Sequence, residues 1–422
     1  MGKFLGYRCS LCGTEFSPDE ITYTCPKDGG NVDVVLDYEG LKNKYKPEDI
    51  LSRNDPSLWR YLPLVPVSQP EGDATPLHAV GGTPVFNLSV LAQKLGLQNL
   101  WLKDESRNPT ASFKDRASAI VVARAREIEA DVVVTASTGN AGAALAGMAA
   151  AVGQKAMIFA PKSAPEAKVT QLLIFGAKVI LVDGTYDQAF DLTIQCAEEF
   201  GWYCRNTGYN PFTAEGKKTS AFEIWEWWQD AHKKWHDEFG EDLDHPPLTV
   251  FVPVGDGNII SGIHKGFKDL YQLGWLARIP RLIGVQAEGS AAISNAFHGN
   301  TETITAVSAR TIADSISVDF PRDGVRAIRA AKETGGTYVN VSDDEILRAI
   351  AELGKMGIFA EPAGAAAYAG LVGAAAAGVV GSADPVLVLN TGSGLKDVRT
   401  AMRAVQPPPI IEPTLEAVKK LL

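Results

Sequence analysis

Asn108–Arg116 reads N-P-T-A-S-F-K-D-R and sets one lysine among small, polar and aromatic neighbours. An ordinary surface lysine has a pKa near ~10.4, so its amine is protonated at neutral pH and cannot attack a carbonyl. Partial burial beside Phe113 would lower the pKa of Lys114 and favour a neutral amine that can form a Schiff base. The same segment also fits the solvated first turn of a helix that continues through Ile120. On its own it leaves a covalent lysine and a plain helix start both open.

Three further segments of polar residues and glycine favour the covalent lysine. Each follows an apolar run, and they are Ser137–Gly142 (S-T-G-N-A-G), Gly255–Asn258 (G-D-G-N) and Thr391–Gly394 (T-G-S-G). Open α/β sheets bind cofactors in such loops, which follow the carboxyl ends of the strands. The sequence thus predicts a cofactor site in which Lys114 takes part.

Apolar runs rich in β-branched residues indicate the strands of these sheets. They lie at 131–136, 156–160, 179–182, 248–254, 282–285 and 385–389, and helical stretches separate most of them. Such alternation is typical of parallel βαβ units. Ser342 with Glu345 forms a capping-box pattern, and Pro362 marks the start of an Ala-rich helix. Because glycines interrupt the run Ala363–Val380, we expect a buried helix there and not a membrane span.

Composition and charge narrow the class of protein. The 422 residues are 45% hydrophobic and 21% charged, as in globular proteins of two or three domains. The formal net charge of -10 argues against general binding to nucleic acid or to anionic membranes. The first residues lack the apolar stretch of a signal peptide, and five cysteines, three of them near the N-terminus, do not resemble a disulfide framework. We therefore expect a cytoplasmic protein.

Two short knuckles near the N-terminus have the spacing of a zinc ribbon. Cys9 and Cys12 form the first, and Cys25 and Asp28 form the second, with aspartate where a fourth cysteine would be usual. Zinc accepts carboxylate oxygen, so three thiolates and one carboxylate can bind it. A zinc ribbon, a ribbon that has lost its metal and a redox use of the thiols remain open. None of them makes the module catalytic.

The ordered set of motifs resembles the fold-type II pyridoxal-phosphate enzymes, and most closely the threonine synthase family. Besides the segments above, the set includes Gly81–Pro84 (G-G-T-P), Glu215–Thr219 (E-G-K-K-T) and Thr391–Asp397 (T-G-S-G-L-K-D). The resemblance covers essentially the whole chain. It implies an α/β fold with open, mostly parallel sheets that carry helices on both faces. The implied division is a zinc-ribbon-like module at 1–36, a connector at 37–76, a large cofactor-binding domain at 77–120 and 215–422, and a small substrate-contacting domain at 121–214.

The resemblance also implies how pyridoxal 5'-phosphate is held. Lys114 would carry the cofactor as a Schiff base, Asn140 would donate to the phenolic oxygen of the ring, and Thr391 would face the pyridine nitrogen. The cofactor phosphate would lie on the N–H groups of a loop that opens a helix, made of Gly255, Asp256, Gly257, Asn258 and Ile259. The Asp256 carboxylate should then turn away from the phosphate. The alternatives are a helix N-cap at Asn140 and plain turns in the two glycine-containing loops.

The expected substrate site departs from the family pattern at one position. Ser137 and Thr138 would receive the substrate carboxylate at the start of a helix. In threonine synthases the segment at 206–213 helps to hold the substrate phosphate, which involves Asn206 and Thr207, but the arginine expected at its end is Thr213 here. Either the substrate carries no phosphate, or nearby cations replace the arginine. The candidate cations are Arg107, Arg205, Lys217 and Lys218.

The resemblance implies a lyase that converts O-phosphohomoserine and water to threonine and phosphate, with a homodimer as a candidate assembly. Because Thr213 stands where an arginine is expected, a serine or threonine dehydratase, or a β-replacement enzyme acting on O-phosphoserine, remains an alternative. A nucleotide-binding module is a distant alternative, because no G-x-G-x-x-G segment follows the first clear strand. A smaller departure is Ala111, where glycine is usual. Alanine is tolerated there unless the backbone requires a positive φ.

Overall fold

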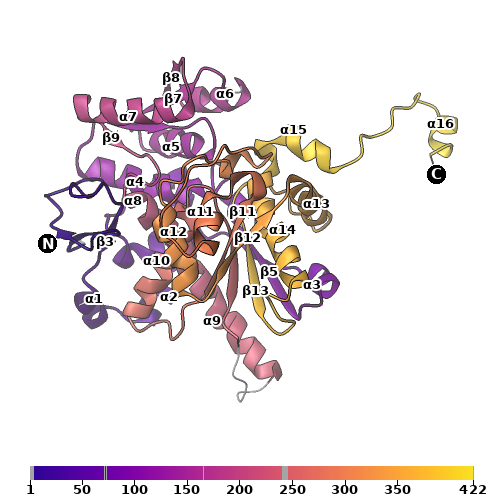
Figure 1. Ribbon diagram of the computed structural model, residues 1–422, viewed down its shortest axis with the longest axis horizontal. Coiled ribbons are helices and arrows are strands. Elements are labelled where there is room, and N and C mark those ends of the chain that lie inside the picture. Colours follow the sequence, from indigo (N-terminus) through magenta and orange to yellow (C-terminus); the bar gives the residue numbers. More distant parts are fainter. Residues whose placement is uncertain (1–3, 71, 73, 165, 240–245, 422) are drawn as a thin grey trace.

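The computed structural model describes residues 4–70, 72, 74–164, 166–239 and 246–421. Two mainly parallel sheets, of six and four strands, form its body, and a three-stranded antiparallel sheet lies at the N-terminus (Figure 1). Helices pack on both faces of the large sheet, which confirms the predicted α/β class. The C-terminal segment leads away from the body and ends in α16 (Leu415–Lys419).

The six-stranded sheet has the order β12-β11-β10-β13-β5-β4, and each neighbouring pair is parallel except β4 with β5. Successive side chains of a strand point to opposite faces. Phe251 therefore packs toward one set of helices, and Val250 and Val252 pack toward another. The strands are β4 (Val85–Asn87), β5 (Asn99–Asp104), β10 (Thr249–Pro253), β11 (Arg281–Ala287), β12 (Thr337–Val341) and β13 (Pro385–Asn390).

The helices of this larger sheet fall into two layers. The Phe251 side is covered by α3 (Ser89–Leu95), α13 (Asp343–Lys355) and α14 (Pro362–Ala376). The Val250 side is covered by α9 (Thr219–Phe239), α10 (Asn258–Gln272), α11 (Ala292–His298) and α12 (Gly324–Glu333). Burial on both faces explains why these strands are continuous apolar runs in the sequence and do not alternate with polar residues.

The four-stranded sheet has the order β8-β7-β6-β9 and is parallel throughout. Val132 and Val134 face α7 (Tyr186–Phe200), whereas Val133 faces α4 (Lys114–Glu127) and α5 (Asn140–Ala150). A third apolar cluster joins Ile158 to α6 (Glu166–Ile174). The strands are β6 (Val132–Ala136), β7 (Lys155–Pro161), β8 (Lys178–Val182) and β9 (Tyr203–Cys204).

The N-terminal sheet has the order β2-β1-β3, with β1 at Gly6–Cys9, β2 at Glu15–Phe16 and β3 at Val32–Val35. Two helices follow in the connector, α1 (Tyr38–Lys44) and α2 (Pro47–Leu51). The other short helices, with 3-10 turns marked η, are η1 (Leu58–Leu64), η2 (Pro76–Ala79), η3 (Glu105–Arg107), α8 (Phe212–Lys217), η4 (Glu288–Ser290), η5 (Asp314–Ile316), η6 (Gly394–Lys396), α15 (Val398–Ala401) and η7 (Met402–Ala404).

All six apolar runs singled out in the sequence are strands. The capping box is also confirmed, because the Ser342 side chain accepts from the Glu345 N–H and the Glu345 side chain accepts from the Ser342 N–H. Pro362 is the first residue of α14, which is largely buried. Among the residues that the structure describes, no helix is both long and apolar enough to cross a membrane.

The two predicted boundaries between the large and the small domain fall inside helices. The boundary at 120 lies within α4 and the boundary at 214 lies within α8, and these two helices pack against each other. The strands of the small sheet come from 132–204, and those of the large sheet come from 85–104 and 249–390. The division into a large and a small domain at these boundaries stays a proposal.

Candidate active site

The loops that follow β6, β10 and β13 open onto one cavity of about 470 Å³. These are the ends at which open α/β sheets bind ligands. Most of the site residues expected from the sequence line this cavity. They are Lys114, Ser137, Thr138, Asn140, Arg205, Thr207, Lys217, Gly255, Asp256, Gly257, Asn258, Ile259 and Thr391.

Lys114 is the first residue of α4 and lines the cavity. Burial lowers its pKa to about 8, helped by the positive charge of Arg205 and opposed by Glu361 and Asp256. A lysine amine with this pKa is partly neutral near physiological pH and can act as a nucleophile or a base. The lowered pKa is what the residues around Lys114 predicted.

Hydrogen bonds within the Asn108–Arg116 segment and to the loop after β13 hold Lys114 in place. The Thr110 N–H donates to Asp115 Oδ2 over 2.6 Å, and the Phe113 N–H donates to the Thr391 carbonyl over 2.9 Å. Ala111 has a φ of 63°, in the left-handed region that favours glycine. The backbone at position 111 therefore does require a positive φ, and alanine is less suited to this position than glycine.

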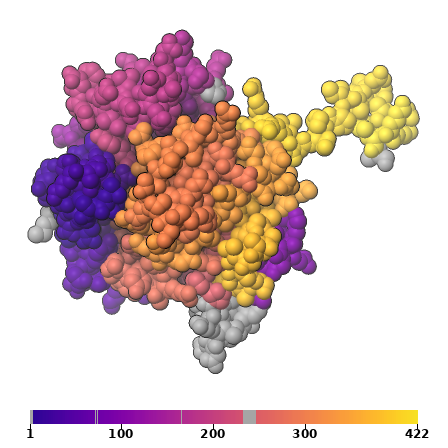
Figure 2. Space-filling view, viewed as in Figure 1, coloured from indigo at the N-terminus to yellow at the C-terminus, as the bar shows by residue number. Residues whose placement is uncertain are grey.

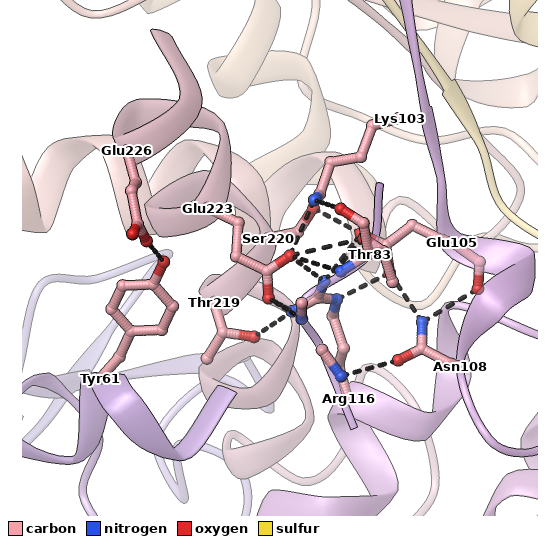
Figure 3. A network of polar contacts seen from close by, with 12 residues as sticks. Tyr61, Thr83, Lys103, Glu105, Asn108, Arg116, Thr219, Ser220, Glu223 and Glu226 are labelled. Carbon is pink, nitrogen blue, oxygen red and sulfur yellow. Dashed lines mark hydrogen bonds and ion pairs between the residues drawn. The ribbon is translucent and has the colours of Figure 1, made fainter. Parts of the chain in front are cut away.

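A buried polar network fixes the start of α4 from the other side (Figure 3). Arg116, two residues after Lys114, is fully buried and pairs with Glu105 at 2.8 Å and with Glu223 at 2.7 Å. Lys103 of β5 pairs with Glu223 at 2.7 Å and donates to the Thr83 carbonyl. Two cations thus match two anions, as buried charges require. The network gives Thr83 of the G-G-T-P segment and Arg116, which follows Asp115, a structural role beside the lysine.

The Gly255–Ile259 loop ends where α10 begins, at Asn258. Gly257 has a φ of 92°, and a Cβ there would lie 2.6 Å from the Asp323 carbonyl oxygen, so glycine is needed for space as well as conformation. The Asp256 Oδ1 accepts from the Arg322 N–H over 2.9 Å, and burial raises the pKa of this carboxyl. The loop N–H groups at a helix N-terminus suit an anionic group.

Asn140 is the first residue of α5, with Gly139 as the N-cap, so it is not the N-cap itself. Its Nδ2 lies 2.9 Å and 3.0 Å from the two carboxylate oxygens of Glu361. Glu361 is buried, and burial raises its pKa. Glu361 was not predicted as a site residue. The only signal was an acidic residue set between apolar residues directly before Pro362.

Two buried cations face the cavity without acidic partners. Arg205 is fully buried, donates to Ser118 and Thr207 hydroxyls, and leaves its Nη2 without a hydrogen-bond partner. Burial lowers the pKa of Arg205 to about 10, and the pKa of Lys217 lies well below its usual value because of burial and of Lys114 and Arg205 nearby. Among the described residues, neither forms an ion pair. Unpaired buried charge at a cavity wall favours an anionic ligand.

Three expected substrate residues lie elsewhere. Lys218 is buried between Glu215 and Asp269, and Arg107 is exposed and pairs with Asp104 at 3.0 Å. Asn206 accepts from the Thr135 hydroxyl and the Ala136 N–H, and so fastens the end of β6. The contacts of Arg107 and Lys218 are structural, whereas Asn206 Nδ2 is buried without a hydrogen-bond partner. That these three side chains meet the substrate stays a prediction.

The four knuckle residues converge as a zinc ribbon requires. One ligand atom from each of Cys9, Cys12, Cys25 and Asp28 lies within 4.8 Å of all the others. Thiolates with one carboxylate form a set that zinc accepts. The cluster can therefore bind zinc, and it lies in the N-terminal sheet and not at the cavity.

Comparisons with known proteins show the family of this chain. Residues 77–392 match the family described as pyridoxal-phosphate dependent enzyme. Threonine synthase of Methanocaldococcus jannaschii is 37% identical, and threonine synthase of Methanosarcina acetivorans is 35% identical, each over 98% of both chains. The processed form of threonine deaminase isoform 2 from Solanum lycopersicum has a similar fold, with a TM-score of 0.64 and 22% identity over 81% of this chain and 92% of its own.

The chain therefore belongs to the pyridoxal-phosphate-dependent enzymes, with the fold-type II architecture. Within this family, two relatives that match it over 98% of their length are threonine synthases. The deaminase likeness extends to the fold alone.

Proposed function

We propose that this enzyme is a threonine synthase that converts O-phosphohomoserine and water to threonine and phosphate. The observation that carries the proposal is Arg205, a buried guanidinium with a free Nη2 at the cavity wall and no acidic partner among the described residues. The full-length relatives support the same reaction. A dianionic substrate explains why this acidic chain keeps unpaired cations inside one cavity.

The cavity residues fit pyridoxal phosphate. Lys114 has the lowered pKa that a covalent lysine needs, and the Gly255–Ile259 loop offers N–H groups at the start of α10 with no Cβ at Gly257. Thr391 supplies a neutral hydroxyl at the cavity. When bound, the cofactor acts as an electron sink that acidifies protons near the amino-bearing carbon of the substrate. A neutral partner for its ring nitrogen favours elimination and replacement over transamination.

Lys114 is the proposed acid and base of the reaction. Its uncharged amine would take a proton from Cα of the substrate, release it, and then take a proton from Cβ, while the bound cofactor would supply the electron sink. With a pKa of about 8, it can both accept and return these protons near neutral pH. The C–O bond at Cγ then breaks, and the phosphate leaves with the bonding pair. The hydroxyl of water ends on Cβ, Lys114 returns one proton to Cγ and one to Cα, and the remaining proton of water leaves with the phosphate.

The substrate is held at both ends in this account. Its carboxylate lies at the start of α5, where Ser137 and Thr138 line the cavity and the helix dipole favours negative charge. Its phosphate meets Arg205 and Lys217. These two side chains replace the arginine that the family pattern has where this chain has Thr213. Thr213 itself is buried and donates to the Asn210 carbonyl over 2.7 Å. Holding both ends orients Cα and Cβ toward Lys114.

A substrate comparison tests the proposal. Purified enzyme and the Arg205→Ala variant are assayed with O-phosphohomoserine, O-phosphoserine, serine and threonine. We expect wild type to prefer O-phosphohomoserine and the variant to show a KM for it raised by about tenfold or more, as for a lost charge-assisted contact. Arg107→Ala is the matched control, because this exposed arginine pairs with Asp104 outside the cavity. Faster turnover of serine or threonine by wild type would establish the dehydratase instead.

The remaining expectations belong to the same proposal. They are the division into a large domain at 77–120 and 215–422 and a small domain at 121–214, a homodimer, and a cytoplasmic location. The five free cysteines support a reducing compartment.

A further inference from the structure

The N-terminal module, residues 4–36, is connected to the Gly255–Ile259 loop through the side chains of Asn31 and Asp323. In Figure 2 the indigo surface of this module lies directly against the orange surface of the body. The contact includes Asn31, which donates to the Arg322 carbonyl over 2.7 Å and to Asp323 Oδ1 over 3.0 Å. The module is therefore hydrogen-bonded to the segment that precedes α12.

Asn31 is part of the cysteine cluster's own framework. It follows Gly30, whose N–H donates to Asp28 Oδ1 over 2.8 Å and whose carbonyl accepts from the Cys25 N–H over 2.9 Å. The Asn31 carbonyl accepts from the Ser10 N–H over 2.8 Å, in the other knuckle. The position of Asn31 thus depends on both halves of the cluster.

Asp323 connects this framework to the loop. Its buried carboxylate accepts from Asn258 Nδ2 over 2.7 Å, and its own N–H donates to the Asp256 carbonyl over 3.0 Å. Its carbonyl oxygen is the atom that a Cβ at Gly257 would approach to 2.6 Å. Asp323 therefore contacts three consecutive residues of the loop that we assign to the cofactor phosphate.

Arg326 provides a second connection in parallel. It binds the Asp323 carboxylate with two hydrogen bonds, of 2.6 Å and 2.7 Å, and its Nη1 donates to Asp33 Oδ1 of the module over 2.6 Å. With Asn31 and Asn258, this gives Asp323 four side-chain donors and fills its acceptor capacity. Loss of a hydrogen-bond donor to a buried carboxylate costs free energy. A movement of the module that displaces Asn31 or Asp33 should therefore shift Asp323 and, through it, the loop.

We propose that the Cys9/Cys12/Cys25/Asp28 cluster and the cofactor-phosphate loop are energetically coupled through Asn31 and Asp323, with Arg326 in parallel. A zinc-class divalent ion in the cluster fixes Asn31 and Asp33, which fix Asp323 and hence the loop, and cofactor affinity rises. These are positioning residues, since none of them touches the cofactor. Coupling between two sites is reciprocal, so the cofactor tightens the ion by the same factor. The proposal rests on the loop assignment made under the proposed function.

Binding measurements on the full-length, cofactor-free protein test the coupling. The Kd of pyridoxal phosphate is measured by absorbance with the protein stripped of metal and again with zinc saturating. We expect zinc to tighten binding by about fivefold or more, and the cofactor to tighten zinc by the same factor. Pyridoxal without its phosphate should bind with no zinc dependence, because the loop meets only the phosphate. Equal affinities with and without zinc would overturn the proposal.

Substitutions in the module test whether the coupling passes through Asp323. Asn31→Ala combined with Asp33→Ala should bring the coupling factor close to one while zinc still binds, since neither residue is in the cluster. Arg329→Ala is the matched control, because Arg329 donates to the Ser10 carbonyl and pairs with Glu302 but makes no hydrogen bond to Asp323 among the described contacts. It should leave the factor unchanged. Full coupling in the double variant would refute the path through Asp323.

The Gly257→Ala variant distinguishes a failure of the coupling from a failure of the assignment of the loop to the cofactor phosphate. The added methyl would press on the Asp323 carbonyl and should weaken pyridoxal phosphate. If the cofactor affinity of Gly257→Ala is unchanged, the loop assignment fails, and the coupling fails with it. If that affinity falls but zinc has no effect on wild type, only the coupling is wrong.

Discussion

Lys217 and Lys218 are consecutive in the chain, yet Lys217 lines the active-site cavity, whereas the Lys218 ammonium lies 2.8 Å from Asp269 Oδ2 in a buried ion cluster. Glu215 and Lys265 complete that cluster. Lys217 bonds instead to the Asn258 side chain of the cofactor-phosphate loop. Lys217 thus has no acidic partner among the described residues and can meet an anionic ligand, whereas Lys218 stabilises the fold.

Alanine at the two lysines should consequently have different effects. Lys217→Ala should raise the KM for O-phosphohomoserine by roughly tenfold, because it removes a charge-assisted contact. Lys218→Ala should leave KM unchanged and lower the free energy of unfolding by roughly 3 kcal/mol, because it leaves carboxylates buried with fewer cations. Steady-state kinetics and denaturant unfolding check both. The same KM in wild type and Lys217→Ala would remove Lys217 from the phosphate site.

Ala111→Gly should stabilise the enzyme. A left-handed backbone costs a non-glycine residue roughly 1–2 kcal/mol, and the greater freedom of glycine in the unfolded chain offsets roughly 0.5–1 kcal/mol of the gain. A net increase of up to about 1.5 kcal/mol in the free energy of unfolding is expected. Ala150→Gly, at the exposed end of α5, is the control and should destabilise. A loss of stability in Ala111→Gly would show that φ at 111 is not strained.

The pKa of Lys114 predicts a pH dependence in the cofactor-free protein. Burial lowers this pKa from 10.5 to about 8, so between these pH values the unfolded chain holds a proton that the folded chain has released. Stability therefore rises with pH across this interval through Lys114. Lys114→Met should be more stable than wild type below pH about 8 and lose that advantage toward pH 10.5. Chemical unfolding at several pH values measures it, and a constant difference would contradict the lowered pKa.

Asp28→Cys should strengthen zinc binding. The four ligand atoms already lie within 4.8 Å of one another, and a fourth thiolate completes an all-cysteine set. Zinc affinity is measured by competition with a chelator for wild type, Asp28→Cys and Asp28→Ala. The expected order of affinity is cysteine, then aspartate, then alanine. Equal affinities would mean that position 28 does not contact the metal.

The sequence predicted the parts of the fold that depend on local pattern. Its apolar runs became β6, β7, β8, β10, β11 and β13, and the loops after three of them meet at the cavity. It did not predict β5, because this central strand carries a buried lysine, Lys103, whose partner Glu223 lies far along the chain. The edge strands β4 and β12 were not predicted either, because exposed polar residues interrupt their apolar pattern.

The sequence could not predict the role of residues whose partners lie far away along the chain. Nothing local distinguishes Lys217 from Lys218, and only the fold shows that Asp269 meets the second. Glu361 contacts Asn140, and Asn31 contacts Asp323, across separations of more than 200 residues. Motif spacing identifies loops that bind a cofactor, whereas the contacts that position those loops follow from tertiary packing.

Incubation of the purified enzyme, supplied with pyridoxal phosphate, with O-phosphohomoserine tests the proposed reaction when phosphate and threonine are measured together. We predict that the two products form in equal amounts, and that Lys114→Ala forms neither while remaining folded. Absence of phosphate release, combined with rapid deamination of serine or threonine to 2-oxo acids, would contradict it.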